Sequence, residues 1–80
     1  MYALDFDPPA AKQRDTLPAE ALAAFMEARA LLEIAPWSGM RPSNNPSGNM
    51  LSLSFGEYGI VTYFVLEERL LVYIVRITWL

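Results

Sequence analysis

The sequence predicts an α+β fold in which two helices pack on one face of a mostly antiparallel, four-stranded sheet. Apolar residues recur with helical spacing over residues 18–35 and with a period of two over most of residues 50–79. A short alternating segment precedes the helices. Helices and strands that come in separate runs are typical of this fold class. The order strand, helix, helix and three-strand meander fits a single domain over residues 1–80.

The first strand is expected over Tyr2–Asp7, where apolar side chains alternate with small and acidic ones. Pro8 and Pro9 end this strand, because proline donates no hydrogen bond to a β-ladder. Asp7 suits the N-cap of a short helix that reaches Arg14, and Pro8 suits its first helical position.

A second, longer helix is expected from about Pro18 to about Ala35, because this segment is rich in alanine and leucine. Pro36 ends it. Its apolar stripe has alternating spacings of four and three residues. The stripe consists of Ala21, Phe25, Ala28, Leu32 and Ala35, widened by Leu22 and Met26.

Residues 36–49 are expected to form a loop, because all of them except Trp37, Met40 and Arg41 are Pro, Gly, Ser or Asn. So long a loop in a small domain is either functional or mobile. Three strands are expected after it, with a two-residue turn at Gly56 and Glu57 closing the first hairpin. The strands cover residues 50–55, 58–66 and 70–79, and the second turn covers residues 67–69.

The composition excludes several classes of site. The chain has no cysteine and no histidine, so it lacks disulfides, thiolate metal sites and the commonest general base near neutral pH. Its net charge is −3 and its pI is near 4.6, the opposite of a free-standing nucleic-acid binder. Asp5, Asp7 and Asp15 have no spacing typical of metal ligands. We expect no cofactor, no metal, no membrane span and a cytoplasmic location.

Several local phrases resemble the RelE/ParE family of bacterial toxins, over nearly the whole chain. The first is Leu4–Lys12, and Leu17-Pro18 then precedes the long helix. The others are Ala35-Pro36-Trp37, Phe55-Gly56-Glu57-Tyr58 and Val75-Arg76-Ile77-Thr78. The resemblance implies a RelE-like fold and a small toxin held inactive by an antitoxin. RelE-like members cut messenger RNA on the ribosome, and ParE-like members poison DNA gyrase.

The sequence departs from this family at the positions that carry charge. Ser54 and Gly59 stand where arginine is usual, and Trp79-Leu80 stands where a His-Arg or Lys-Arg pair is common. No lysine follows Lys12. Because negative charge develops on the phosphate oxygens during RNA cleavage, that chemistry needs fixed cations. We therefore expect a catalytically degenerate member of the family.

Three residues remain as weak catalytic candidates. Arg41 and Arg76 would carry transition-state charge, and Tyr58 would orient the ribose. Each also has a simpler interpretation. Arg76 would be solvated or paired with Glu57 or Glu67, Arg41 would be a solubilising loop charge, and Tyr58 would pack in the core or in an interface.

The strands themselves predict a protein partner. Residues 58–66 and 70–75 are uncharged on both faces, but a pair of helices covers only one face of a sheet. The other face would expose more apolar surface than a small monomer normally does. An antitoxin or a second copy of the chain would cover it. The candidate anchors are Met50, Tyr63, Tyr73 and Trp79.

Three functional hypotheses follow. The first is a catalytically degenerate RelE/ParE-like protein of a toxin–antitoxin system that acts through protein–protein binding, with the ribosome or gyrase as a possible target. The second is an active, ribosome-dependent mRNA endoribonuclease. The third is a non-toxic structural or regulatory orphan of the same fold.

Overall fold

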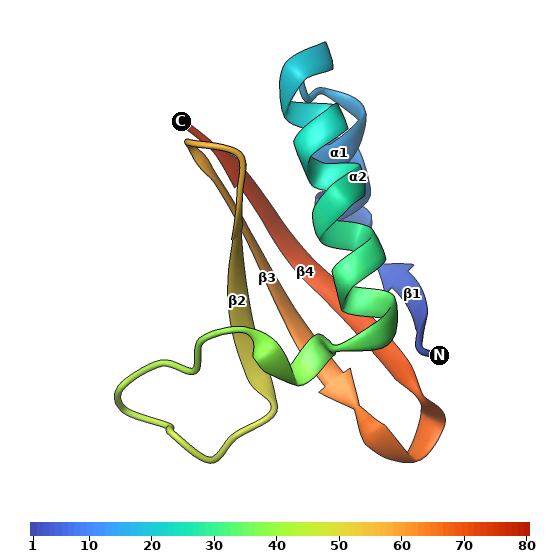
Figure 1. Cartoon of the computed structure of the whole chain (residues 1–80), viewed down its shortest axis with the longest axis vertical. Helices are drawn as coiled ribbons and strands as arrows, with labels where there is room; N and C mark the ends of the chain where they lie inside the picture. Colours follow the sequence, from blue (N-terminus) through green and yellow to red (C-terminus); the bar gives the residue numbers. More distant parts are fainter.

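A computed structural model describes residues 1–80 and has two helices on one face of a four-stranded sheet (Figure 1). The predicted fold class is confirmed. The strands are β1 (Ala3–Phe6), β2 (Met50–Phe55), β3 (Gly59–Leu66) and β4 (Leu71–Trp79). The helices are α1 (Pro8–Asp15) and α2 (Ala19–Ile34), with 3₁₀ turns η1 (Pro36–Ser38) and η2 (Glu67–Arg69).

The sheet has the strand order β1-β4-β3-β2. The three C-terminal strands form the predicted antiparallel meander, and β1 pairs in parallel with β4. The strands β1 and β2 therefore occupy opposite edges. The helical connection between them crosses the sheet, which is why both helices lie on the same face (Figure 1).

Helix α1 begins where the sequence predicts, but its N-cap works differently. Asp7 occupies the N-cap position without a side-chain capping bond. Its carboxylate instead accepts a hydrogen bond of 2.6 Å from the hydroxyl of Tyr73. Pro8 and Pro9 carry no backbone N–H, so fewer amides at this helix end need a partner.

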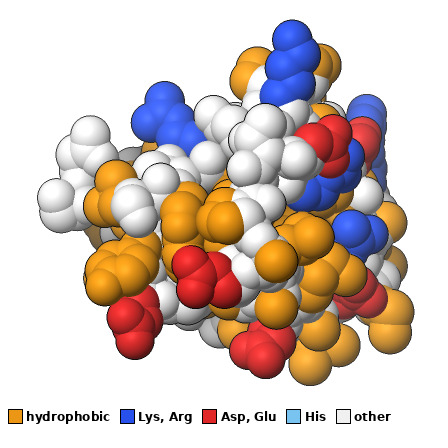
Figure 2. All heavy atoms as spheres, turned by 90° about the horizontal axis from the view of Figure 1, so that it is seen from above, with side chains coloured by type: hydrophobic (Ala, Val, Ile, Leu, Met, Phe, Trp, Pro, Cys, Tyr) orange, Lys and Arg blue, Asp and Glu red, His pale blue; other side chains and the backbone are white.

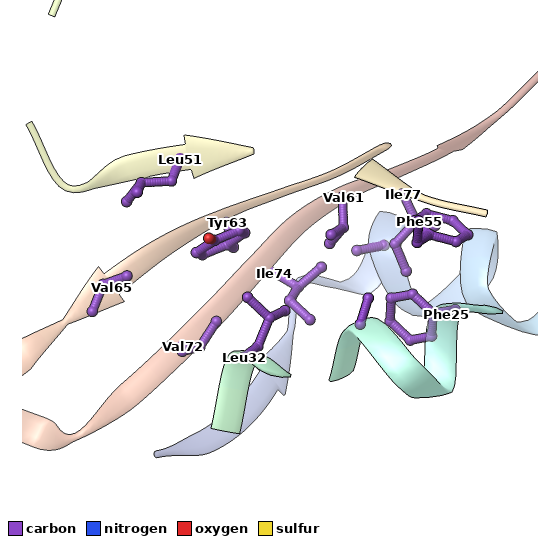
Figure 3. Packing of buried hydrophobic residues seen from close by; sticks show 12 residues of the cluster. Phe25, Leu32, Leu51, Phe55, Val61, Tyr63, Val65, Val72, Ile74 and Ile77 are labelled. Atoms are coloured by element: carbon purple, nitrogen blue, oxygen red, sulfur yellow. The ribbon is translucent and has the colours of Figure 1, made fainter. Parts of the chain in front are cut away.

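The core lies between α2 and the covered face of the sheet (Figure 3). The predicted stripe is confirmed at Ala21, Phe25, Ala28 and Leu32, all buried. The ring of Phe25 contacts Phe55 edge-on, with 5.5 Å between the ring centroids. The sheet contributes the other large buried side chains: Leu51, Phe55, Val61, Tyr63, Val65, Val72, Ile74 and Ile77.

The predicted widening of the stripe by Leu22 and Met26 is wrong, since these side chains are 40% and 52% exposed. A helix on a sheet buries only the side chains that point directly at the strands. At 100° per residue, Met26 lies about 100° around the helix from Phe25, away from the sheet.

We expect Phe25→Ala to lower the free energy of unfolding by about 3–5 kcal/mol, because it leaves a cavity where α2 meets the sheet. Urea denaturation followed by circular dichroism measures this effect. Met26→Ala, one residue along the same helix, is the matched control and should change stability far less. Equal losses in the two variants would contradict the packing described above.

Candidate functional site

The face of the sheet that lacks helices is the main candidate surface, and we call it the open face. Along β3, buried residues alternate with partly or fully exposed ones, so every second side chain points away from the helices. The strand pairing extends this pattern to β2 and β4. The open face consists of Ala3, Asp5, Met50, Ser52, Ser54, Ile60, Thr62, Phe64, Leu66, Leu71, Tyr73, Val75, Arg76 and Thr78.

A β-bulge places two consecutive residues of β4 on this face. Thr62 pairs with Arg76 while Tyr63 pairs with Ile74, so Val75 is an extra residue in the ladder. Ile74 and Ile77 on either side are buried, whereas Val75 is partly exposed and Arg76 is exposed. The bulge thus brings Arg76 opposite Thr62, near the middle of the open face.

Arg76 has no ion-pair partner. The two ion pairs of the chain are Arg14–Asp15 and Arg29–Glu33. The expected pairing of Arg76 with Glu57 or Glu67 is therefore wrong. Arg76 lies on a strand, and the two glutamates lie in the turns at its opposite ends.

Arg41 is held at the edge of the sheet. Its Nε donates a hydrogen bond of 2.9 Å to the Gly48 carbonyl, and its guanidinium carbon lies 5.2 Å from the centroid of the Trp37 ring. Its neighbour Met40 bridges to Ser52 on β2. The row Met40–Ser52–Thr62–Arg76 spans three strand spacings, or about 14 Å.

Tyr58 lies at a different end of the molecule. It is 55% exposed in the β2–β3 turn, and its ring meets Trp79 edge-on at 5.9 Å. Four residues of strand separate it from Thr62, or about 13 Å. The structure therefore does not bring Arg41, Tyr58 and Arg76 together, and none of the hollows on the surface is lined by Arg76.

Two of the basic residues, Arg14 and Arg29, lie over the ring of Phe6, and each forms an ion pair with an acidic side chain. Figure 2, which looks onto the end of the molecule that carries the C-terminus, shows hydrophobic side chains over an extended area with basic and acidic side chains among them. Position 59, where the family resemblance implies arginine, is sterically closed. A Cβ atom on Gly59 would lie about 2.5 Å from the ring of Phe55.

The four predicted anchors lie in three different places. Met50 and Tyr73 are on the open face and partly buried. The hydrogen bond from Tyr73 to Asp7 raises the pKa of Tyr73. Trp79 lies on the helix side, where it stacks on Phe55 with 5.8 Å between ring centroids, so its expected position on the open face is wrong.

Tyr63 is not on the open face either, and its expected role as an anchor there is wrong. Its side chain is fully buried, and its hydroxyl donates a hydrogen bond of 2.7 Å to the Pro36 carbonyl. Burial raises the pKa of Tyr63. The backbone at Gly39 passes so close to this hydroxyl that a side chain there would collide with it. Residues 58–66 are apolar on both faces, so alternation alone left the side of Tyr63 undecided.

A cluster around Glu67 went unrecognised in the sequence. Its carboxylate accepts hydrogen bonds of 2.6 and 2.8 Å from the hydroxyl of Tyr2 and one of 2.7 Å from the indole N–H of Trp37. These bonds, the one from Tyr2 first, lower the pKa of Glu67, and the same contact raises the pKa of Tyr2. Because its donors stabilise the ionised form, Glu67 is poorly suited to act as a general base.

This cluster joins three segments that are far apart in the chain: the residue before β1, the turn η1 and the turn η2. A hollow of about 600 Å³ lies beside it, lined by Trp37, Asn49 and residues 65–69. No local pattern signals such a contact, because the three partners meet only when the strands are in register.

No three Asp or Glu side chains come close enough together to hold a metal ion. Neither helix has the length and apolarity needed to cross a membrane.

No protein-family model matches the sequence, and no curated protein does. Solved structures do match. The isolated RelE toxin of E. coli has a TM-score of 0.85 at 16% identity, over 99% of this chain and 84% of that one. The toxin–antitoxin complex RelBE2 of Mycobacterium tuberculosis has a TM-score of 0.81 at 24% identity, over 99% and 98%. The intact E. coli RelBE complex has a TM-score of 0.79 at 18% identity, over 100% and 98%. The predicted RelE-like resemblance is confirmed at the level of the fold.

We expect Tyr63→Phe to lower the free energy of unfolding by about 1–2 kcal/mol, because it removes the donor that satisfies the Pro36 carbonyl. Urea denaturation measures the loss. Tyr58→Phe is the matched control, since its exposed hydroxyl makes no hydrogen bond within the chain. Stability unchanged by Tyr63→Phe would contradict a structural role for this bond.

We expect Glu67 to make the stability sensitive to acid. Since the pKa of Glu67 is lowered on folding, its contribution is fully present above the ordinary value of 4.5 and is lost as the pH falls through the lowered pKa. Glu67→Gln should reduce stability at pH 7 and flatten the pH dependence below 4.5.

Urea midpoints measured from pH 7 downward check this expectation. Glu68→Gln is the control, because Glu68 is exposed and has no hydrogen-bond partner among these groups. Parallel curves for Glu67→Gln and the unchanged chain would contradict it.

Proposed function

We propose that this chain is the toxin-type component of a toxin–antitoxin pair, that it acts by binding protein, and that the RNA-cutting chemistry of its fold relatives is degenerate in it. One observation carries the proposal: the open face combines apolar with hydroxyl side chains, and Arg76 is its one cation. Such a face suits contact with an apolar protein surface better than contact with a phosphate backbone.

The dispersion of the catalytic candidates supports the loss of chemistry. A phosphorane-like transition state needs several preorganised charges around one phosphate, and removing one such contact costs about 3 kcal/mol of barrier height. Arg41 contacts Gly48 and Trp37 at the sheet edge, and Tyr58 contacts Trp79 at the β2–β3 turn. Arg76 lies between these places on the open face and contacts neither residue in this structure, so the three side chains are not preorganised around one point.

The antitoxin partner is proposed from the solved complexes. Two of the three solved structures named above are complexes in which a RelE-type toxin is bound to its antitoxin. An antitoxin that covers the open face would remove its apolar side chains from water. A second copy of the chain is the other candidate partner. The proposal places the protein in the cytoplasm, with the ribosome or gyrase as its target.

The active endoribonuclease remains the second candidate, since Arg76 is exposed and unpaired and is thus free to contact a phosphate. The non-toxic orphan is the third. Induction of the chain in a bacterial host separates the orphan from the other two, because growth arrest is expected from a toxin and normal growth from the orphan.

We expect messenger RNA to stay intact when the purified chain is added to translating ribosomes, because no cationic centre surrounds the scissile phosphate. Primer extension on the messenger detects cuts, and E. coli RelE serves as the positive control. Arg76→Ala should behave like the unchanged chain. Cleavage that Arg76→Ala abolishes would overturn the proposal in favour of the endoribonuclease.

A further inference from the structure

We infer that the open face is a docking site for an apolar protein segment that carries one carboxylate, and that Arg76 is the residue that selects it. This inference rests on the proposed partner-binding function and deepens it by stating the chemistry of the partner. The antitoxin segment would cover the apolar side chains and place an Asp or Glu on the guanidinium.

The nearest neighbours of Arg76 on β3 and β4 are uncharged. Thr62 lies directly across from it on β3, and Val75 precedes it in the bulge. The next row of the sheet, toward the start of β4, runs through Met50, Phe64 and Tyr73 and ends at Asp5 on β1. A segment that covers these rows also covers the base of Arg76.

The acidic groups nearest to this region already have partners. The Asp7 carboxylate accepts a hydrogen bond from the Tyr73 hydroxyl. Asp5 pairs with Tyr73 across the β1–β4 ladder, and its carboxylate accepts a hydrogen bond of 2.9 Å from the Phe6 amide. Neither carboxylate forms an ion pair with Arg76, so its guanidinium is exposed and available to a carboxylate from a partner.

Coverage of the face imposes a selection rule. A segment without an acidic residue would bury Arg76 unpaired, and an uncompensated buried charge is strongly destabilising. A segment with a well-placed carboxylate would form a charge-assisted, bidentate pair with the guanidinium instead. Of two apolar segments that differ only in one acidic residue, the segment with that residue is therefore expected to bind more tightly, because only its carboxylate pairs with Arg76.

The presence of a single cation on the open face also argues against two other binding partners there. A second copy docked symmetrically around Arg76 would bring two guanidinium groups together, and their like charges would repel. An RNA strand would meet one cation on a chain of net charge −3, which is too little to neutralise a phosphate backbone.

The sheet edges favour docking on the face over addition of a strand. On β2, Ser52 exchanges backbone hydrogen bonds of 2.8 and 2.9 Å with Met40, which covers the middle of that edge. On β1, the Phe6 amide is capped by Asp5. Both edges are thus partly blocked to a new strand, which favours binding through side-chain contacts on the open face.

The test is selection of peptides from a random display library on the immobilised full chain. Enriched peptides are expected to combine Leu, Ile, Val or Phe with one Asp or Glu. Their affinity should fall at least tenfold for Arg76→Gln, and it should also fall when the acidic residue of the peptide is replaced by its amide. Arg69→Gln is the matched control, because Arg69 is an exposed arginine in the turn η2, off the face, and it should leave affinity unchanged.

A second pair of variants separates charge from structure. Thr62→Glu supplies a carboxylate directly across the strand from Arg76 and should weaken peptide binding as Arg76→Gln does, whereas Thr62→Gln should not. Circular dichroism confirms that each variant folds. A loss that Thr62→Gln shares with Thr62→Glu would overturn the inference.

The remaining outcomes are equally decisive. Captured peptides that bind Arg76→Gln as tightly as the unchanged chain would overturn this inference alone and leave the proposed partner binding intact. Failure to capture any peptide would count against the proposed function itself. A dimer held through the open face in light scattering, or a single-stranded oligoribonucleotide that binds through Arg76, would overturn the inference in favour of those occupants.

Discussion

The one-sided packing of α2 against the sheet is the constraint on which the rest of the structure depends. Phe25 and Leu32 occupy the centre of a single core, and the chain has no second helical layer to cover the opposite side. Each side chain of a strand therefore points either into this core or onto the open face. Tyr63 points into the core and is buried, whereas its neighbour Phe64 lies on the open face and is available to a partner.

Scarcity of charge gives the open face its character. Apolar and hydroxyl side chains make up most of this face, and Arg76 is its one cation. A single unpaired cation gives little stabilisation to the transition state of phosphate chemistry, but it can discriminate between protein partners. The Coulomb interaction between this cation and a carboxylate becomes stronger when a docked partner excludes water.

Two hydrogen-bonded contacts hold the connection after α2 in place. Tyr63 fixes the Pro36 carbonyl from inside the core, and Glu67 fixes the indole of Trp37 from the β3–β4 turn. The path of residues 36–41 past the β2 edge, which covers part of that edge, follows from these anchors. Polar groups thus fix a segment that apolar packing alone would leave undetermined, because hydrogen bonds are directional.

The sequence by itself determined the elements, their order and the core stripe of α2, because periodicity and the positions of proline are local properties of the chain. It also indicated that the strands after residue 57 are rich in apolar residues on both faces. Only the tertiary structure decided which side of β3 faces the helices, that a bulge brings Val75 and Arg76 onto one face, and that Glu67 meets Tyr2 and Trp37. Those features depend on strand register, and register is set by contacts between residues far apart in the chain, which no local pattern encodes.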